Sequence, residues 1–207
     1  MNKLSSCKTV FFVCVVCVIE AIGSYARTFT NLVSFNGANG IGPAAGLVQA
    51  TDRNLYGTTV SGGKYNSGTV FQITPGGELT TVYNFCVLAN CADGNGPFGA
   101  LIQATDGNFY GTTLQGGEYG GGAGTVFKIT PSGKLTILHS FCSLLNCLDG
   151  DSPTGALIQA TDGRLYGTTR FGGKYGEGTI FKITSTGQRT TLYDFCPQDQ
   201  LPGWLCS

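Results

Sequence analysis

The side chains best suited to bind a ligand occur in three copies of a Gly-Gly-x-Tyr loop and in two longer connectors. Aromatic rings can stack on the faces of sugar rings, and charged groups beside them can hydrogen-bond to sugar hydroxyls. The alternative is that each tyrosine packs on its own loop as a repeated structural anchor. The candidate ligand-binding residues are Lys64, Tyr65, Asp93, Glu118, Tyr119, Asp149, Asp151, Lys174 and Tyr175.

Neither a catalytic grouping nor a metal site is evident in the sequence. Asp93-Gly94-Asn95 and Asp149-Gly150-Asp151 have the spacing of a calcium loop, but they lack its further ligands, so turn-forming Asx residues are the better interpretation. The single histidine, His139, stands where the other copies have tyrosine, which indicates packing. We therefore expect no catalytic residue, no metal and no cofactor.

These residues belong to a sequence that repeats three times. The aspartate of an Ala-Thr-Asp motif recurs as Asp52, Asp106 and Asp162, which gives a period of 54 and then 56 residues. A period in this range indicates a repeat architecture in which each unit buries a face against the next. The three aspartates are expected to cap hairpin turns rather than to form an acidic triad.

Each repeat has the pattern of four short antiparallel strands. In the middle copy, strands are predicted over residues 100–104, 109–113, 125–130 and 134–141, with tight turns at Thr105–Asn108 and Thr130–Gly133. Gly111 is expected to let a neighbouring backbone approach closely. In such a sheet the two tight turns lie at one end, and the long loops that carry the candidate residues lie at the other.

The predicted fold is all-β and β-propeller-like, with three four-stranded antiparallel repeats and one extra N-terminal strand over residues 29–35. A β-trefoil or a β-prism is the alternative. The expected domains are a signal peptide over residues 1–26 and one repeat domain over 27–207, with repeats of about 46–98, 99–154 and 155–207. Three blades are few for a closed propeller, so self-association that closes a ring is a further expectation.

The N-terminal segment and the cysteines indicate export. Residues 1–26 combine two lysines, an apolar run of about ten residues and a small-residue ending, as in a secretory signal peptide. The six cysteines that follow fall in one pair after each repeat, and a disulfide within each pair is the pairing that repeats with the structure. The predicted disulfides are Cys86–Cys91, Cys142–Cys147 and Cys196–Cys206.

The charge balance argues against two classes of partner. The chain carries 12 basic and 12 acidic side chains, without the basic excess that binding to nucleic acid or to an anionic membrane requires. We expect no nucleic-acid partner and no membrane span. An extracellular glycan or protein is the expected partner.

The motifs Ala-Thr-Asp-Gly-x-(Leu/Phe)-Tyr-Gly-Thr-Thr, Gly-Gly-x-Tyr and Gly-Thr-(Val/Ile)-Phe-Lys-Ile-Thr, with the Phe-Cys-x4-Cys connector, resemble the Gloeo/Verruco (GloVer) repeat of exported bacterial proteins. The resemblance covers nearly all of the chain after residue 26. It implies a secreted or surface-located, propeller-like protein and no known activity. We expect a disulfide-stapled binding or scaffold module for an extracellular glycan or protein. The alternative is an extracellular carbohydrate-active hydrolase or lyase on a propeller scaffold.

Overall fold

The computed structural model describes residues 29–119 and 122–196, and the compact unit that holds the repeats begins at Leu32. The signal peptide expected over residues 1–26 lies outside the described residues. Within the described part, the regular structure is β-strand except for two single-turn 3-10 helices. No helix there has the length and the apolar character needed to cross a bilayer.

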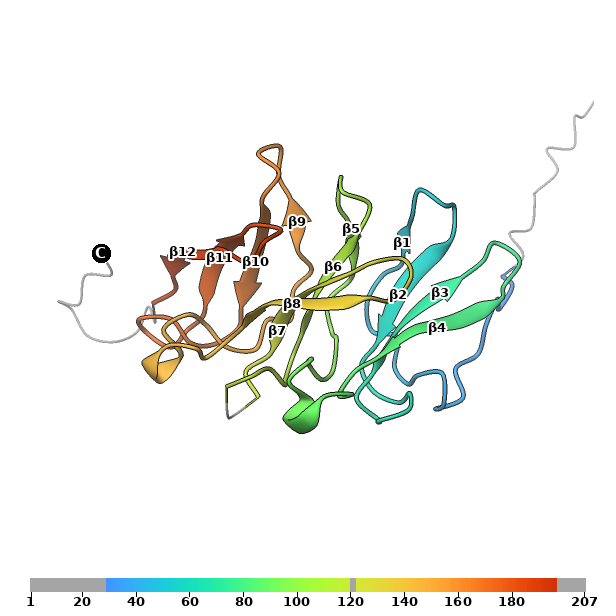
Figure 1. The fold of residues 1–207 in the computed structure, drawn as a ribbon, viewed down its shortest axis with the longest axis horizontal. Coiled ribbons are helices and arrows are strands. Elements are labelled where there is room, and N and C mark those ends of the chain that lie inside the picture. Colours follow the sequence, from blue (N-terminus) through green and yellow to red (C-terminus); the bar gives the residue numbers. More distant parts are fainter. Residues whose placement is uncertain (1–28, 120–121, 197–207) are drawn as a thin grey trace, which may run out of the picture. The chain divides into compact units, whose positions relative to one another are not determined.

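Each repeat forms one four-stranded antiparallel sheet whose strands follow chain order (Figure 1). The chain is therefore all-β and propeller-like, as predicted, and each sheet has the up-and-down topology of a propeller blade. We call the sheets blades 1, 2 and 3. Blade 1 contains β1 (Val48–Gln49), β2 (Leu55–Thr59), β3 (Thr69–Ile73) and β4 (Leu79–Asn84); blade 2 contains β5 (Ile102–Gln103), β6 (Phe109–Thr113), β7 (Thr125–Ile129) and β8 (Leu135–Ser140); blade 3 contains β9 (Ile158–Gln159), β10 (Leu165–Thr169), β11 (Thr179–Ile183) and β12 (Arg189–Asp194).

The apolar core lies between the blades in two separate layers. One layer joins blade 1 to blade 2, and it includes Tyr56 and Phe85 against Phe109 and Phe127. The other joins blade 2 to blade 3 through the equivalent residues of the next repeat. A β-prism or a trefoil would enclose one common core, whereas these sheets are layered face to face.

Strands β6 and β7 lie where they are predicted, and a glycine between them leaves room for an aromatic ring. Gly111 pairs with Phe127 across the two strands. A Cβ on Gly111 would lie 2.7 Å from Cζ of Phe127 and 2.9 Å from Cδ2 of Leu101. The expectation that Gly111 admits a neighbouring backbone is therefore wrong, because side chains of its own blade cover it.

The first strand of each blade is shorter than predicted. The middle repeat was expected to have a strand over residues 100–104, but β5 spans two residues. The residues before β5 instead contact the neighbouring blades. The Gly99 carbonyl accepts a hydrogen bond from the Thr58 hydroxyl of blade 1 at 3.4 Å. A Cβ on Gly99 would also lie 2.7 Å from the Gly155 carbonyl oxygen of blade 3.

The aspartates of the first hairpins cap their turns. Asp106 Oδ1 accepts a hydrogen bond from the backbone N–H of Asn108 at 3.1 Å, and its Oδ2 accepts one from the Tyr110 hydroxyl at 2.7 Å. Asp52 and Tyr56 repeat this pair at 2.8 Å. Burial raises the pKa of Tyr56 to about 12, together with its hydrogen bond to Asp52 and the charge of that carboxylate.

Residues 29–35 do not form the predicted extra strand. Among the described residues, no strand pairs with them in a β-ladder. Phe35 nevertheless packs on Phe71, with ring centroids 5.0 Å apart and an interplanar angle of 64°. Phe85 packs on Phe127 in nearly the same way, at 5.2 Å and 63°. The end of this segment thus takes the place of a preceding blade's last strand.

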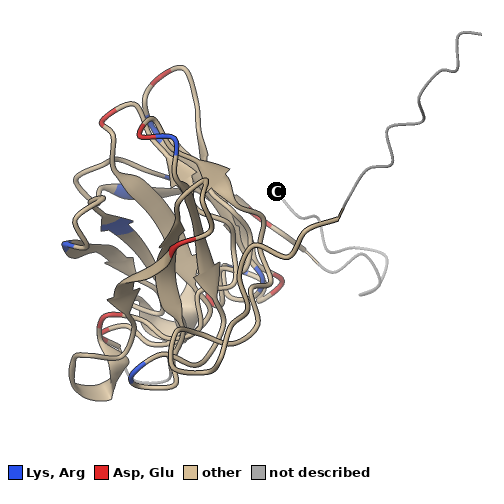
Figure 2. Ribbon diagram, turned by 90° about the vertical axis from the view of Figure 1, so that its right-hand side faces the viewer, with Lys and Arg blue, Asp and Glu red and all other residues tan. Residues whose placement is uncertain are grey.

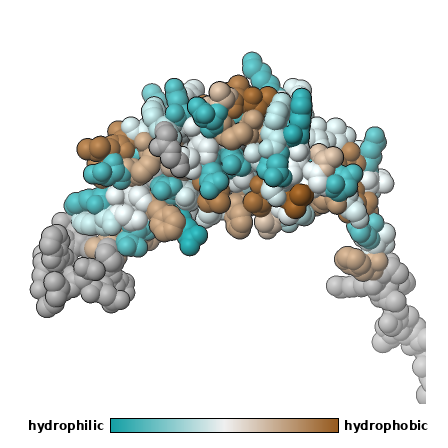
Figure 3. Space-filling view, turned by 90° about the horizontal axis from the view of Figure 1, so that it is seen from below, coloured by the Kyte–Doolittle hydropathy of each residue, from teal (hydrophilic) through white to brown (hydrophobic). Residues whose placement is uncertain are grey.

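The long connectors gather at the opposite end from the first hairpins (Figure 1). Two of them contain the 3-10 turns η1 (Ala89–Cys91) and η2 (Leu145–Cys147). Figure 3 looks onto this end and shows apolar and polar side chains interspersed. Basic and acidic residues are likewise interspersed along the described ribbon (Figure 2).

Candidate functional site

Disulfides pin the first two connectors, as predicted. Cys86 is bonded to Cys91 and Cys142 to Cys147, in each case closing the loop just after the last strand of a blade. The pairing within a repeat is thus confirmed for two repeats. Cys206, the expected partner of Cys196, lies outside the described residues.

Asp93 holds the first of these loops from the inside. Its side chain is buried. The carboxylate accepts hydrogen bonds from the Tyr83 hydroxyl at 2.9 Å and from the backbone N–H groups of Val87 and Leu88 at 3.0 Å each. Asp93 therefore joins the last strand of blade 1 to the disulfide loop, and its carboxylate does not face solvent.

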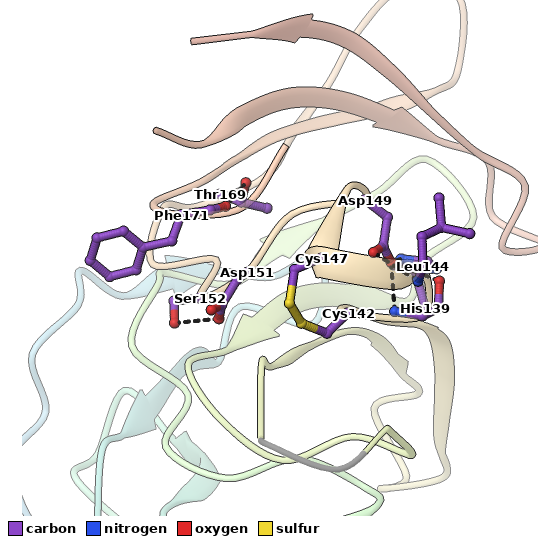
Figure 4. The surroundings of a disulfide bond; sticks show 10 residues. His139, Cys142, Leu144, Cys147, Asp149, Asp151, Ser152, Thr169 and Phe171 are labelled. Carbon is purple, nitrogen blue, oxygen red and sulfur yellow. Dashed lines mark hydrogen bonds and ion pairs between the residues drawn. A yellow bond between two sulfur atoms is a disulfide. The ribbon is translucent and has the colours of Figure 1, made fainter. Parts of the chain in front are cut away.

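Asp149 does the same in blade 2, with His139 in place of the tyrosine (Figure 4). Nε2 of His139 lies 3.0 Å from Asp149 Oδ2 and carries the proton, since an ionised carboxylate can only accept. The Ser143 hydroxyl donates to the same oxygen at 2.7 Å, and the backbone N–H of Leu144 donates to Oδ1 at 3.2 Å. Burial alone would raise the pKa of Asp149, but these hydrogen bonds outweigh it and lower the pKa well below its ordinary value.

Asp151 lies two residues further along, beside Ser152 (Figure 4). The Ser152 hydroxyl donates to Asp151 Oδ1 at 2.8 Å. The backbone of Asp151 pairs with that of Phe171 in an isolated bridge to blade 3. Asp149 and Asp151 thus have different partners, although they are close in sequence: Asp149 bonds to the end of blade 2, and Asp151 bonds to Ser152 and pairs with blade 3.

The charged residue and the tyrosine of each outer Gly-Gly-x-Tyr loop contact each other. The Lys64 ammonium lies 5.3 Å from the ring centre of Tyr65, and the Lys174 ammonium 4.9 Å from that of Tyr175. The backbone N–H of Lys64 donates to Asn84 Oδ1 at 2.8 Å, and that of Lys174 to Asp194 Oδ1 at 2.9 Å. An amide or a carboxylate at the end of the last strand therefore anchors each outer loop.

The equivalent loop of blade 2 borders a hollow of about 280 Å³. Glu118 is exposed, and Tyr119 is 43% exposed. The backbone N–H of Glu118 donates to the Ser140 hydroxyl at 3.2 Å. The hollow is lined by Glu118, Tyr119, Ile137, Leu138, His139, Ser140 and Ser143.

The hollow is explained by the residues at which blade 2 departs from its neighbours. Ser140 is shorter than the Asn84 or Asp194 at the same place, and His139 is smaller than the tyrosines of the other blades. The loop itself is two residues longer, because 12 positions separate the paired threonines that flank it, against 10 in blades 1 and 3. The hollow of blade 2 is thus lined by smaller side chains than those at the equivalent places of blades 1 and 3.

A family comparison accounts for nearly the whole chain. The model of the Gloeobacter/Verrucomicrobia repeat matches residues 21–202. The chain belongs to this repeat family. No curated protein matches it.

Two solved structures resemble this Gloeobacter/Verrucomicrobia repeat protein. The first, provisionally described as a gluconolactonase, has a TM-score of 0.44 and 15% identity over 70% of this chain and 47% of its own. The second, provisionally described as an oxidoreductase (glucose dehydrogenase) of Thermus thermophilus, has a TM-score of 0.45 and 16% identity over 70% of this chain and 45% of its own. The chain spans a little under half the length of each.

In this family member the structure brings together only some of the predicted site residues. Glu118 and Tyr119 share the hollow of blade 2, and Asp149 holds His139 at its edge. The outer pairs at Lys64 and Lys174 lie on other blades and do not line the hollow. The Asp93 carboxylate is buried and accepts hydrogen bonds within its own connector. No cluster of three or more potential metal ligands occurs among the described residues.

Sequence reasoning missed His139, Ser140 and Ser143 as site residues. His139 does pack, edge-on to Phe141 at 4.9 Å, much as Tyr83 packs on Phe85 at 5.3 Å. Its other edge lines the hollow. The signal that could have found these residues is the departure of one repeat from the other two at neighbouring positions.

Proposed function

We propose that the protein is an exported binding module that holds an extracellular glycan in the hollow beside Glu118 and Tyr119. The observation that carries the proposal is that an exposed carboxylate residue, an accessible tyrosine and two serines line this hollow together. Sugars present hydroxyls on their edges and C–H groups on their faces, so they suit such a set of partners. The volume lies near the roughly 300 Å³ at the lower end of small-molecule sites, which suits a short stretch of saccharide.

The outer loops are proposed to make weaker contacts with the same polymer. Lys64, Tyr65, Lys174 and Tyr175 lie on equivalent loops and are at least partly exposed. A ligand that repeats along its length could meet a similar loop on each blade. The main contact remains the hollow, because blade 2 alone combines the shorter side chains with the longer loop.

A binding role is favoured over hydrolysis by the number of acids at the site. Most glycosidases use a pair of carboxyl groups on either side of the scissile bond. Among the described residues that line the hollow, Glu118 is the one carboxylate. The nearby Asp149 carboxylate is buried and occupied by internal hydrogen bonds.

The disulfides support an extracellular ligand. Disulfides persist in oxidising compartments, and two of them hold the connectors of this chain. We propose that residues 1–26 direct secretion and that the protein acts outside the cell.

A glycan array with the exported chain tests the proposal. The informative variant combines Glu118→Lys with Ser140→Asn, since both changes install residues that blade 1 carries at the same places. We expect binding to weaken by about tenfold or more, the equivalent of about 1.4 kcal/mol. Lys134→Glu is the matched control, since the exposed Lys134 follows the tight turn at the other end of blade 2 and the change installs the residue that blade 1 carries there; this variant should bind nearly as well as the wild type. If no glycan binds, or if the double variant binds like the wild type, the proposal is wrong.

A further inference from the structure

The two junctions between blades repeat the same contacts. At the first, the Tyr56 ring lies 4.2 Å from that of Phe109, and the backbone N–H of Thr51 donates to Gln103 Oε1 at 2.9 Å. At the second, the backbone N–H of Thr105 donates to Gln159 Oε1, also at 2.9 Å. We call the face of a blade that contacts the next blade in the chain its following face, and the face that contacts the preceding blade its leading face. The following face of one blade and the leading face of the next are therefore complementary halves of one interface.

Blade 3 presents the following half of this interface without a partner among the described residues. Phe195 is 41% exposed, whereas its equivalents Phe85 and Phe141 are 0% and 1% exposed. The exposed fraction of Ile158 is 63%. A mainly apolar hollow of about 260 Å³ opens on this face, lined by Ala156, Ile158, Tyr166, Gly167, Thr168 and Ile180.

Blade 1 presents the leading half. Leu47 is 49% exposed, whereas the equivalent Leu101 and Leu157 are 3% and 1% exposed because the preceding blade covers them. Gln49, the equivalent of the glutamines that cross the two internal junctions, is exposed as well. The chain thus carries both halves of an interface that it forms twice internally.

We propose that blade 3 of one copy docks on blade 1 of a second copy through these two faces. This inference goes beyond glycan binding and does not depend on it. Thr168 would donate to the carbonyl of Ala45 in the second copy, as Thr112 donates to Gly155 within the chain at 3.2 Å. Two copies joined at both ends would supply six blades, within the four to eight of closed propellers.

The N-terminal segment occupies part of the docking face in the single chain. Phe35 lies on Phe71 with the ring geometry of the Phe85–Phe127 and Phe141–Phe181 pairs. On docking, Phe195 of the second copy takes the place of Phe35. Residues 32–35 are displaced rather than β12, because β12 pairs with β11 at five positions and residues 32–35 belong to no strand.

Sedimentation velocity of the exported full chain, without saccharide and over a wide concentration range, tests the proposal. The wild type should form a species of twice the chain mass. Ile158→Glu should weaken this association by at least about tenfold, because it places a charge in an apolar junction. Leu145→Glu is the matched control, since Leu145 is 82% exposed in a connector and should tolerate the same change.

Phe35→Ala gives a second and opposite expectation. The change removes the competing side chain, so association should become tighter. A chain that stays monomeric at every concentration overturns the proposal. Association that survives Ile158→Glu unchanged, or that Leu145→Glu abolishes equally, also overturns it.

Discussion

At the residue scale, Asp149 and Asp93 stabilise the connectors, whereas the sequence suggested that they contact a ligand. Each is buried and each receives hydrogen bonds from the end of its blade's last strand and from the loop that follows. Their repetition from one blade to the next is explained by this shared task. The sequence could place both in loops, but not say whether the carboxylates point inward.

Asp149→Asn should lower the free energy of unfolding by about 1–3 kcal/mol at neutral pH. The amide keeps the shape of the side chain, but one of the two carboxylate oxygens is replaced by an NH2 group. This group faces a donor that bonds to the oxygen in the wild type, so a buried donor is left unpaired. Asp151→Asn is the matched control, because Asp151 is only partly buried and its hydrogen bond comes from the adjacent serine. Urea denaturation compares the two; equal losses for both would contradict this role for Asp149.

The same carboxylate should make stability depend on pH in acid. The pKa of Asp149 is lowered in the folded chain, so its contribution is complete above the unfolded value of 3.8 and is lost as the pH falls below it. The Asp149→Asn variant lacks this component. The difference in unfolding free energy between wild type and variant should therefore shrink on going from about pH 7 to about pH 3. A constant difference would contradict the assignment.

At the scale of elements, the strands that the sequence predicted well are those whose partners lie in the same blade. The residues of β6 and β7 alternate between faces and meet across a regular ladder. The first strand is shorter than predicted, because residues such as Gly99 make their contacts with neighbouring blades. Contacts between repeats cannot be read from the pattern of one repeat.

Gly111→Ala should destabilise blade 2 by about 1–3 kcal/mol, as overpacking does in a filled core. The new methyl group would meet Phe127 and Leu101, which are 0% and 3% exposed and have little room to move. Gly46→Ala is the matched control, since nothing lies within 4 Å of its Cβ position and the other two repeats have alanine there. Thermal unfolding of both variants checks this; a stable Gly111→Ala chain would contradict the packing described.

At the scale of the whole molecule, three nearly identical sequences do not make three identical sites. The repeat period was sufficient to predict blades, their order and the disulfides of the first two connectors. The hollow of blade 2 was not predicted, because it results from smaller side chains and a longer loop acting together in space. The sequence of the segment ending at Phe35 predicts a strand, but in the described part of the chain this segment belongs to no strand and contacts blade 1 through the ring of Phe35.

Hydrogen–deuterium exchange of the full chain, with and without the saccharide that binds best on the array, tests the central claim most directly. That claim is that one blade of three carries the ligand site. Protection should appear at residues 117–119 and 137–143, which border the hollow, and be weak at the equivalent residues of blades 1 and 3. Equal protection on all three blades, or protection confined to other segments, would contradict it.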